Sequence, residues 1–346
     1  MPNTKPSQLL SLLRLLRIPN LPSAISNILM AFLLVNHTWT PVVPLVWLIV
    51  ASSAMYCAGM VLNDVFDYEV DLQQRPDRPI PSGAISKSLA ASIGVTLLVA
   101  GVIIASLCGA FSGAVTGSAL VTCRTGLFAV LLAVCIVLYD GPLKKTILAP
   151  LLMGGCRTLN ILMGASVFTS VATTQLAQAG AASVIVLPDN ELLGMPLLVW
   201  WVAIAIGGLI TGATLLGRNE AVENQPREPM VVAGFIILAS LIVLAFSVYC
   251  PTSPVPGEFQ ISETQKTIFP LFIGFVSLTI MRRVFSAVAT LKPKSVQLGV
   301  VSVLRSLIIF DAAICYMSAP GQIIYALVVL SLLIPTMLLS RIIPST

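Results

Sequence analysis

Three aspartates and two arginines near position 70 form the part of the sequence with the most specific chemistry. Asp64, Asp67 and Asp71 fall within about 60° of arc on a helix, so their carboxylates would share one face. Three like charges at this spacing repel one another unless a cation lies among them, and Mg²⁺ binds one or two carboxylates together with water and substrate phosphates. Arg75 and Arg78 follow directly, and a guanidinium can grip phosphate oxygens through two parallel hydrogen bonds. The pattern predicts a magnesium site for a phosphorylated substrate.

The alternative explanation is a set of solvated charges at the end of a helix. Two features of the sequence favour a binding site instead. The aspartates keep to one helical face at the boundary of an apolar segment, and the prolines at positions 76, 79 and 81 stiffen the loop that presents the arginines.

The elements that position this cluster are expected to be membrane-spanning helices. Of the 346 residues, 57% are hydrophobic and only 10% are charged, whereas about a quarter of a soluble domain is charged. Apolar windows of spanning length fall at about 21–36, 42–64, 87–109, 121–139, 147–169, 195–217, 230–249, 268–288, 297–316 and 321–342. The sequence predicts an all-α, polytopic transmembrane bundle of nine or ten spans that forms a single domain over residues 1–346.

The basic residues lie in alternate loops, and this placement predicts the orientation. One set of loops contains Arg75, Arg78, Lys87, Lys144, Lys145, Arg218, Arg227, Arg282, Arg283, Lys292 and Lys294. The other set has only Lys266 and, at the edge of an apolar window, Arg124. Because basic loops stay on the cytoplasmic side, we expect a multi-pass protein of the cell (inner) membrane with its N-terminus and the aspartate cluster in the cytoplasm.

Two further expectations follow from the distribution of charge. Residues 1–20 contain Arg14 and Arg17 among leucines, which predicts an interfacial helix and not a signal peptide. The basic residues form no extended patch with interleaved aromatic residues, so no nucleic-acid partner is expected.

The stretch that begins at Asn63 resembles the first aspartate-rich signature of the UbiA superfamily of intramembrane prenyltransferases. It reads Asn-Asp-x-x-Asp-x-x-x-Asp, followed by Arg-Pro-x-Arg-Pro-x-Pro-Ser-Gly, and the match is continuous. The span count and the place of the motif after the second span agree with that family. The resemblance implies that the loop 63–86 holds Mg²⁺ on a prenyl diphosphate. The residues implied are Asn63, Asp64, Asp67 and Asp71 for the metal, with Arg75 and Arg78 near the phosphates.

The second signature of the family, an Asp-x-x-x-Asp motif after the sixth span, is divergent in this chain. In the loop 218–228, Asn219 and Glu223 occupy the two positions where the family has aspartates. The resemblance implies that they hold a second Mg²⁺, although a site with less negative charge binds it more weakly. An ordinary polar loop at a helix end remains the alternative.

The loop after the fourth span matches the family less strictly. The resemblance implies that Tyr139, Lys144 and Lys145 lie near the substrate and that a lysine contacts the diphosphate. Lysines are also expected here from topology alone, so the site and the membrane anchor both remain open.

Two pairs of polar residues lie within apolar windows. Arg157 and Asn160 are three residues apart on one helical face, and we expect them to line a cavity, with a structural pair between helices as the alternative. Arg305 and Asp311 are far from any motif, and we expect them to form a structural pair.

The sequence thus favours Mg²⁺-dependent transfer of a prenyl group from an isoprenoid diphosphate to a lipid-soluble or aromatic acceptor. Asp64, Asp67, Asp71 and Lys144 are the expected catalytic residues. The alternative is a UbiA-like membrane protein that binds a prenylated or phosphorylated lipid without transferring it. An ion-coupled transporter has less support, because acidic residues are nearly absent from the apolar windows.

Overall fold

The computed structural model describes residues 8–116, 118–167, 191–218, 227–250, 261–319 and 321–343, and α-helices dominate it. The helices are α1 (Gln8–Leu15), η1 (Ile18–Asn20), α2 (Pro22–Asn36), α3 (Val42–Phe66), α4 (Tyr68–Gln74), α5 (Lys87–Thr116), α6 (Ala119–Asp140), α7 (Ala149–Ala165), α9 (Leu197–Gly217), α10 (Arg227–Phe246), η2 (Ser247–Tyr249), α11 (Glu263–Thr290), α12 (Pro293–Ser318), α13 (Ile323–Ser331) and α14 (Leu333–Ile342). The short strands β1 (Glu191–Leu192) and β2 (Met195–Pro196) pair antiparallel. The predicted all-α fold is confirmed.

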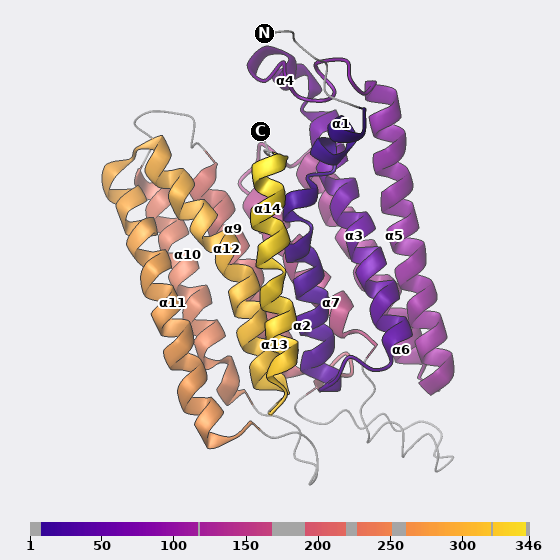
Figure 1. Ribbon diagram of the computed structural model, residues 1–346, viewed down its shortest axis with the longest axis vertical. Helices are drawn as coiled ribbons and strands as arrows, with labels where there is room; N and C mark the ends of the chain where they lie inside the picture. The colour runs from indigo at the N-terminus through magenta and orange to yellow at the C-terminus, as the bar shows by residue number, and fades with distance from the viewer. Residues whose placement is uncertain are drawn as a thin grey trace.

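The long helices form a bundle in which neighbours along the chain pack on one another (Figure 1). Contacts follow the order α3, α5, α6, α7, α9, α10, α11 and α12, and α12 packs back onto α2 and α9. The apolar windows of α2 and α9 are each 67% buried, whereas the value is 22% for α11 and 6% for the C-terminal pair α13 and α14. The inner helices therefore form the core, and the apolar side chains of the outer helices face the surroundings, as expected in lipid.

Nine described helical segments are long and apolar enough to cross a membrane. This group counts α13 and α14 as one segment, Ile323–Arg341, and leaves out α7. Helix α7 has 17 residues, or about 25 Å of length, and packs along α2, α6 and α9. With α7 included, the described helices make ten passages through the bundle, in agreement with the predicted nine or ten spans.

The motif end of the bundle, where α3 meets α4, also carries α1 and the end of α14 (Figure 1). Leu15 of α1 is fully buried in a small apolar cluster with Val61 of α3 and with Ile80 and Ile85 of the following loop. The N-terminal helix therefore packs onto the aspartate motif. Helix α1 ends at Leu15, and Arg17, directly before η1, has a left-handed backbone with φ of 46°.

Helices α7 and α9 approach each other most closely at two glycines. A Cβ atom on Gly154 would lie 2.5 Å from the carbonyl oxygen of Gly207, and closer still to the hydroxyl of Thr211. We expect Gly154→Ala to lower the free energy of unfolding by about 1–3 kcal/mol, because the two helices must separate. The measurement is Tm in detergent. Gly274→Ala is the control, since nothing lies within 4 Å of its added Cβ atom, and equal Tm values for both variants would contradict the close packing.

Candidate active site

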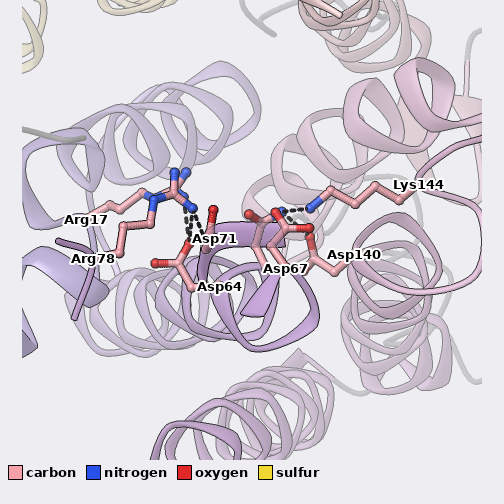
Figure 2. A network of polar contacts seen from close by, with 8 residues as sticks. Arg17, Asp64, Asp67, Asp71, Arg78, Asp140 and Lys144 are labelled. Atoms are coloured by element: carbon pink, nitrogen blue, oxygen red, sulfur yellow. Dashed lines mark hydrogen bonds and ion pairs between the residues drawn. The ribbon is translucent and has the colours of Figure 1, made fainter. Parts of the chain in front are cut away.

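The aspartate cluster lies where α3 gives way to the short helix α4. Helix α3 ends at Phe66, Asp67 has φ of −81° and ψ of 0°, and α4 begins at Tyr68. Asp64 and Asp71, which lie on either side of this break, both contact Arg78, whereas Asp67 at the break itself contacts Lys144. The three carboxylates therefore fall into two groups, and each group is held by its own ion pairs (Figure 2).

The first group contains Asp64 and Asp71 with two arginines. Nη1 of Arg78 lies 2.6 Å from Oδ2 of Asp71 and 3.4 Å from Oδ1 of Asp64. Nη2 of Arg17 donates to the same Oδ1 of Asp64 at 2.8 Å. The side chains of Asp64, Asp71 and Arg78 are 7%, 5% and 6% exposed. Two guanidinium groups thus balance two buried carboxylates, which would be costly to bury alone.

The burial of Arg78 follows from the fold of the proline-rich loop. The amide of Ser82 donates to the carbonyl oxygen of Arg78 at 2.9 Å, and the amide of Ile85 donates to that of Pro79 at 3.1 Å. Ile80 and Ile85 then pack under α1 and α3. These contacts turn the loop back on itself and point the guanidinium toward the aspartates.

The second group contains Asp67 and residues at the end of α6. Nζ of Lys144 lies 2.5 Å from Oδ2 of Asp67, and Nδ2 of Asn63 donates to Oδ1 of Asp140 at 2.9 Å. Asp140 is the last residue of α6 and is 4% exposed, whereas the side chains of Asp67 and Lys144 are each 27% exposed. The loop between α6 and α7 therefore brings Lys144 to the aspartate motif (Figure 2).

A cavity of about 700 Å³ adjoins both groups. Its charged and polar lining includes Arg17, Asn63, Asp67, Arg75, Arg78, Tyr139, Asp140 and Lys144. Its apolar lining includes Met55, Met60, Leu132, Ile136, Met153 and Ile210. Met55 lies about 12 Å of helix before Asn63 on α3, so the cavity extends from the charged end into the apolar bundle.

Arg157 and Asn160 of α7 line this cavity and also bind other helices. Nη1 of Arg157 donates to the carbonyl oxygen of Ser23 at 3.0 Å and to Oδ1 of Asn27 at 2.8 Å. Oδ1 of Asn160 accepts from the Ser52 hydroxyl at 2.7 Å. Arg157 and Asn160 thus line the cavity and also connect helices, so the two alternatives raised by the sequence apply together.

Of the remaining predicted site residues, some line the cavity and others do not. Tyr139 and Arg75 line the cavity, although Arg75 is otherwise exposed. The Lys145 side chain is exposed and is not part of the described cavity lining, while its carbonyl oxygen accepts from Nη2 of Arg218 at 2.7 Å. The predicted ligands Asn219 and Glu223 lie outside the described residues.

A sequence profile of the UbiA prenyltransferase family matches residues 24–217, which is more than half of the chain. The chain belongs to this family. The aspartate-rich motif of this UbiA protein runs from the end of α3 through α4 and the following loop.

Several curated relatives are digeranylgeranylglyceryl phosphate synthases of archaea. The synthase from Sulfurisphaera tokodaii is 30% identical over 93 residues, which are 27% of this chain and 34% of the relative. The synthase from Saccharolobus solfataricus is 29% identical over 161 residues, covering 46% of this chain and 52% of the relative. The chain thus matches about a third to a half of the length of these two proteins. The synthase from Ignicoccus hospitalis is 27% identical over 259 residues, covering 68% of this chain and 80% of the relative.

Solved UbiA structures have the same fold. The structure of a UbiA homologue from Archaeoglobus fulgidus bound to GPP and Mg²⁺ matches with a TM-score of 0.61 at 15% identity. It covers 93% of this chain and 99% of that protein. A digeranylgeranylglyceryl phosphate synthase structure matches with a TM-score of 0.59 at 14% identity, covering 90% and 99%.

Two residues of this UbiA site were not predicted from the sequence. Arg17 reaches Asp64 from the segment expected to be only an interfacial helix, and Asp140 receives the Asn63 amide. The available signals were weak. Arg17 lies two residues before Pro19 in the turn after α1, and Asp140 ends an apolar span just before a Gly-Pro turn.

The predicted pairing of Arg305 with Asp311 in this UbiA chain is wrong. Arg305 is exposed, whereas Asp311 is fully buried and accepts hydrogen bonds from Ser26 and Asn27 of α2. The six-residue spacing places the two side chains on different faces of α12, so they have different neighbours.

The donor set of this UbiA site fits Mg²⁺ when a phosphorylated substrate completes it. Asn63, Asp67 and Asp140 line the cavity with carboxylate and amide oxygens, and Mg²⁺ commonly binds one or two carboxylates plus water and phosphate. In the part of the chain that the structure describes, no three His, Cys, Asp or Glu side chains are grouped to hold a metal by themselves. The absence of such a group is consistent with the ion pairs of Asp64 and Asp71, whose carboxylates are turned toward Arg17 and Arg78.

Proposed function

We propose that this protein transfers a prenyl group from an isoprenoid diphosphate to an acceptor within the membrane. The observation that carries the proposal is the shape of the cavity, which is lined by cations and carboxylates at one end and by apolar side chains along its length. A prenyl diphosphate has the same division into a charged head and an apolar tail. The names of the curated relatives describe products of such a transfer.

Mg²⁺ would be held at the charged end by Asp67 and Asp140, with the side-chain amide oxygen of Asn63 beside them, once Lys144 has left Asp67 for a phosphate. Bound there, it would neutralise negative charge on the leaving diphosphate. The family motif assigns Asp64 and Asp71 to the metal as well, and Asn219 and Glu223 to a second ion. These four assignments stay part of the proposal. For Asp64 and Asp71 they require the phosphates to take over the contacts that Arg17 and Arg78 now make.

The side chains of the cavity account for the other requirements of the reaction. The bond between the allylic carbon and the diphosphate oxygen breaks, and the acceptor nucleophile forms a bond to that carbon and loses its proton. Arg17, Arg75 and Lys144 add positive charge where the diphosphate gains negative charge. The apolar walls hold the tail and exclude water, which would otherwise capture the allylic carbon.

The acceptor in this proposal carries an anionic group. Arg157 lines the cavity away from the aspartate motif, eight residues into α7, and it is suited to a phosphate or carboxylate. A glyceryl ether phosphate is one such acceptor, and it is consistent with the names of the relatives. An aromatic acid, as expected from the sequence, is another. The charged end of the cavity would face the cytoplasmic side of the cell membrane in this proposal, which the basic loops at that end support.

A second candidate function is binding of a prenylated or phosphorylated lipid without transfer. The ion pairs of Asp64 and Asp71 with arginines favour this candidate, because two carboxylates of the motif are already neutralised.

Turnover in lipid separates the two candidates. The purified protein in nanodiscs is incubated with labelled geranylgeranyl diphosphate and either geranylgeranylglyceryl phosphate or an aromatic acid, in Mg²⁺ or in EDTA. We expect diphosphate release and a prenylated product in Mg²⁺ only. Saturable binding of the diphosphate without product would favour the second candidate. Failure to bind any prenyl diphosphate would exclude the proposed transfer.

Removal of the Arg17 side-chain charge tests the N-terminal contribution to this site. We expect Arg17→Gln to raise KM for the prenyl diphosphate by roughly 10-fold, because a charge-assisted contact to phosphate is worth about 1.5–3 kcal/mol. Arg14→Gln, one turn earlier on α1, is the matched control because Arg14 does not line the described cavity. Equal KM values for the two variants would show that Arg17 does not contact the diphosphate.

A further inference from the structure

Asp311 of α12 is a buried ionisable residue that the proposed reaction does not use. It is fully buried within the candidate span Pro293–Ser318, where a carboxylate is costly and usually serves a function. Its Oδ2 accepts hydrogen bonds from the Ser26 hydroxyl at 2.5 Å and from Nδ2 of Asn27 at 2.7 Å. Its Oδ1 has no hydrogen-bond partner among the described residues. A residue kept only for stability would not need an acceptor that stays unsatisfied.

The Asn27 amide connects Asp311 to the cavity. Its nitrogen donates to Asp311, and its oxygen accepts from Nη1 of Arg157 at 2.8 Å. A side-chain amide has its N–H donors on one side and its oxygen acceptor on the other, so a partner that holds the nitrogen in place also determines where the oxygen points. With Asp311 present, the Asn27 oxygen must face Arg157. Without it, the amide can turn over and present its N–H groups to the guanidinium, which has no acceptor.

The guanidinium of Arg157 retains the capacity to bind a ligand in this arrangement. Its described hydrogen bonds to Ser23 and Asn27 use Nη1 twice and Nη2 once, while a guanidinium has five N–H donors. Arg157 also lines the cavity. The Asp311 carboxyl group lies one amide away and makes no described hydrogen bond to the guanidinium.

We propose that Asp311 is a positioning residue that acts through Asn27 to fix the Arg157 guanidinium for the anionic group of the acceptor. This inference rests on the proposed prenyl transfer. It assigns a role in acceptor binding to a residue on α12 that does not line the cavity itself.

The test compares steady-state kinetics of Asp311→Leu and Asp311→Asn in nanodiscs, with geranylgeranyl diphosphate and geranylgeranylglyceryl phosphate varied in turn. Asp311→Leu removes the acceptor atoms, and we expect KM for the anionic acceptor to rise on the order of 10- to 100-fold, as for other misplaced binding groups. KM for the prenyl diphosphate should change by less than about threefold. Asp311→Asn keeps an acceptor for the Asn27 amide and should show a smaller rise. Ser306→Ala, a buried polar residue on the same helix that bonds only within it, is the control for general perturbation.

Two further variants distinguish positioning from a purely structural role. In an Arg157→Met background, adding Asp311→Leu should leave the acceptor KM unchanged, because there is no guanidinium to position. The exchange Asn27→Asp with Asp311→Asn keeps the charge and the hydrogen bonds between the two sites, and it should restore the acceptor KM to within about fivefold of wild type. Additive effects in the Arg157→Met background, or equal KM changes for both substrates, would overturn the inference. Absence of turnover in the wild-type protein would instead reject the proposed function.

Discussion

Replacement of Asp67 with asparagine is expected to reduce kcat/KM for the prenyl diphosphate by about 10³-fold. Asp67 is the one aspartate of the motif that lines the cavity, and it lies beside Asp140 and Lys144 at the charged end. Loss of its charge would remove a metal ligand that acts where negative charge develops on the leaving group, and a single such group is typically worth 10²–10³-fold. The measurement is diphosphate release at a series of Mg²⁺ concentrations. The Mg²⁺ concentration for half-maximal rate should rise in the variant.

The stability of Asp67→Asn should be close to that of the wild type. The side chains of Asp67 and Lys144 are each 27% exposed, so their ion pair contributes little to the free energy of unfolding. Glu69→Gln is the matched control, because Glu69 is a nearby carboxylate on α4 whose side chain is 77% exposed. Asp67 has no place in catalysis if both variants retain wild-type rates and the same Mg²⁺ dependence.

The helices and the aspartate motif could be predicted from the sequence because their signals are local. Long apolar runs predict spanning helices wherever they occur, and the motif lies within one short stretch of chain. The separation of Asp67 from the other two aspartates was not predictable from spacing, since it depends on ion pairs with Arg78 and Lys144. Lys144 is 77 residues from Asp67 in the sequence.

The contacts that complete the site are non-local, and residue types alone did not reveal them. The sequence favours a pair of Asp311 with Arg305 because both lie in one apolar window, but the partners of Asp311 are Ser26 and Asn27, which are 285 and 284 residues away on α2. Arg17 was assigned to an interfacial helix because nothing in its neighbourhood shows that α1 packs over the motif. These contacts depend on how each helix is rotated about its axis and on which helices are neighbours. Neither property can be predicted from the local pattern of a single sequence.

Replacement of Arg78 with methionine is expected to cause the largest loss of stability at the site. Arg78 bridges Asp64 and Asp71, and all three side chains are at most 7% exposed. Without the guanidinium, Asp71 would be a buried carboxylate without its cation, and removal of one partner from a buried pair costs about 3–5 kcal/mol. We expect a marked fall in Tm in detergent and a lower yield of folded protein.

Two comparisons assign this loss to the buried charge and not to the side-chain volume. Asp71→Asn in combination with Arg78→Met removes the unpaired charge, so the double variant should be more stable than Arg78→Met alone, which is a non-additive effect expected only of residues in contact. Arg75→Met changes a neighbouring arginine that is exposed, and its Tm should stay close to wild type. If Arg78→Met and Arg75→Met lower Tm equally, the ion pairs of Arg78 do not stabilise the fold. The Arg78 guanidinium could then leave the aspartates for a phosphate at little cost in stability. Mg²⁺ could replace it between the aspartates without destabilising the loop that carries Arg78.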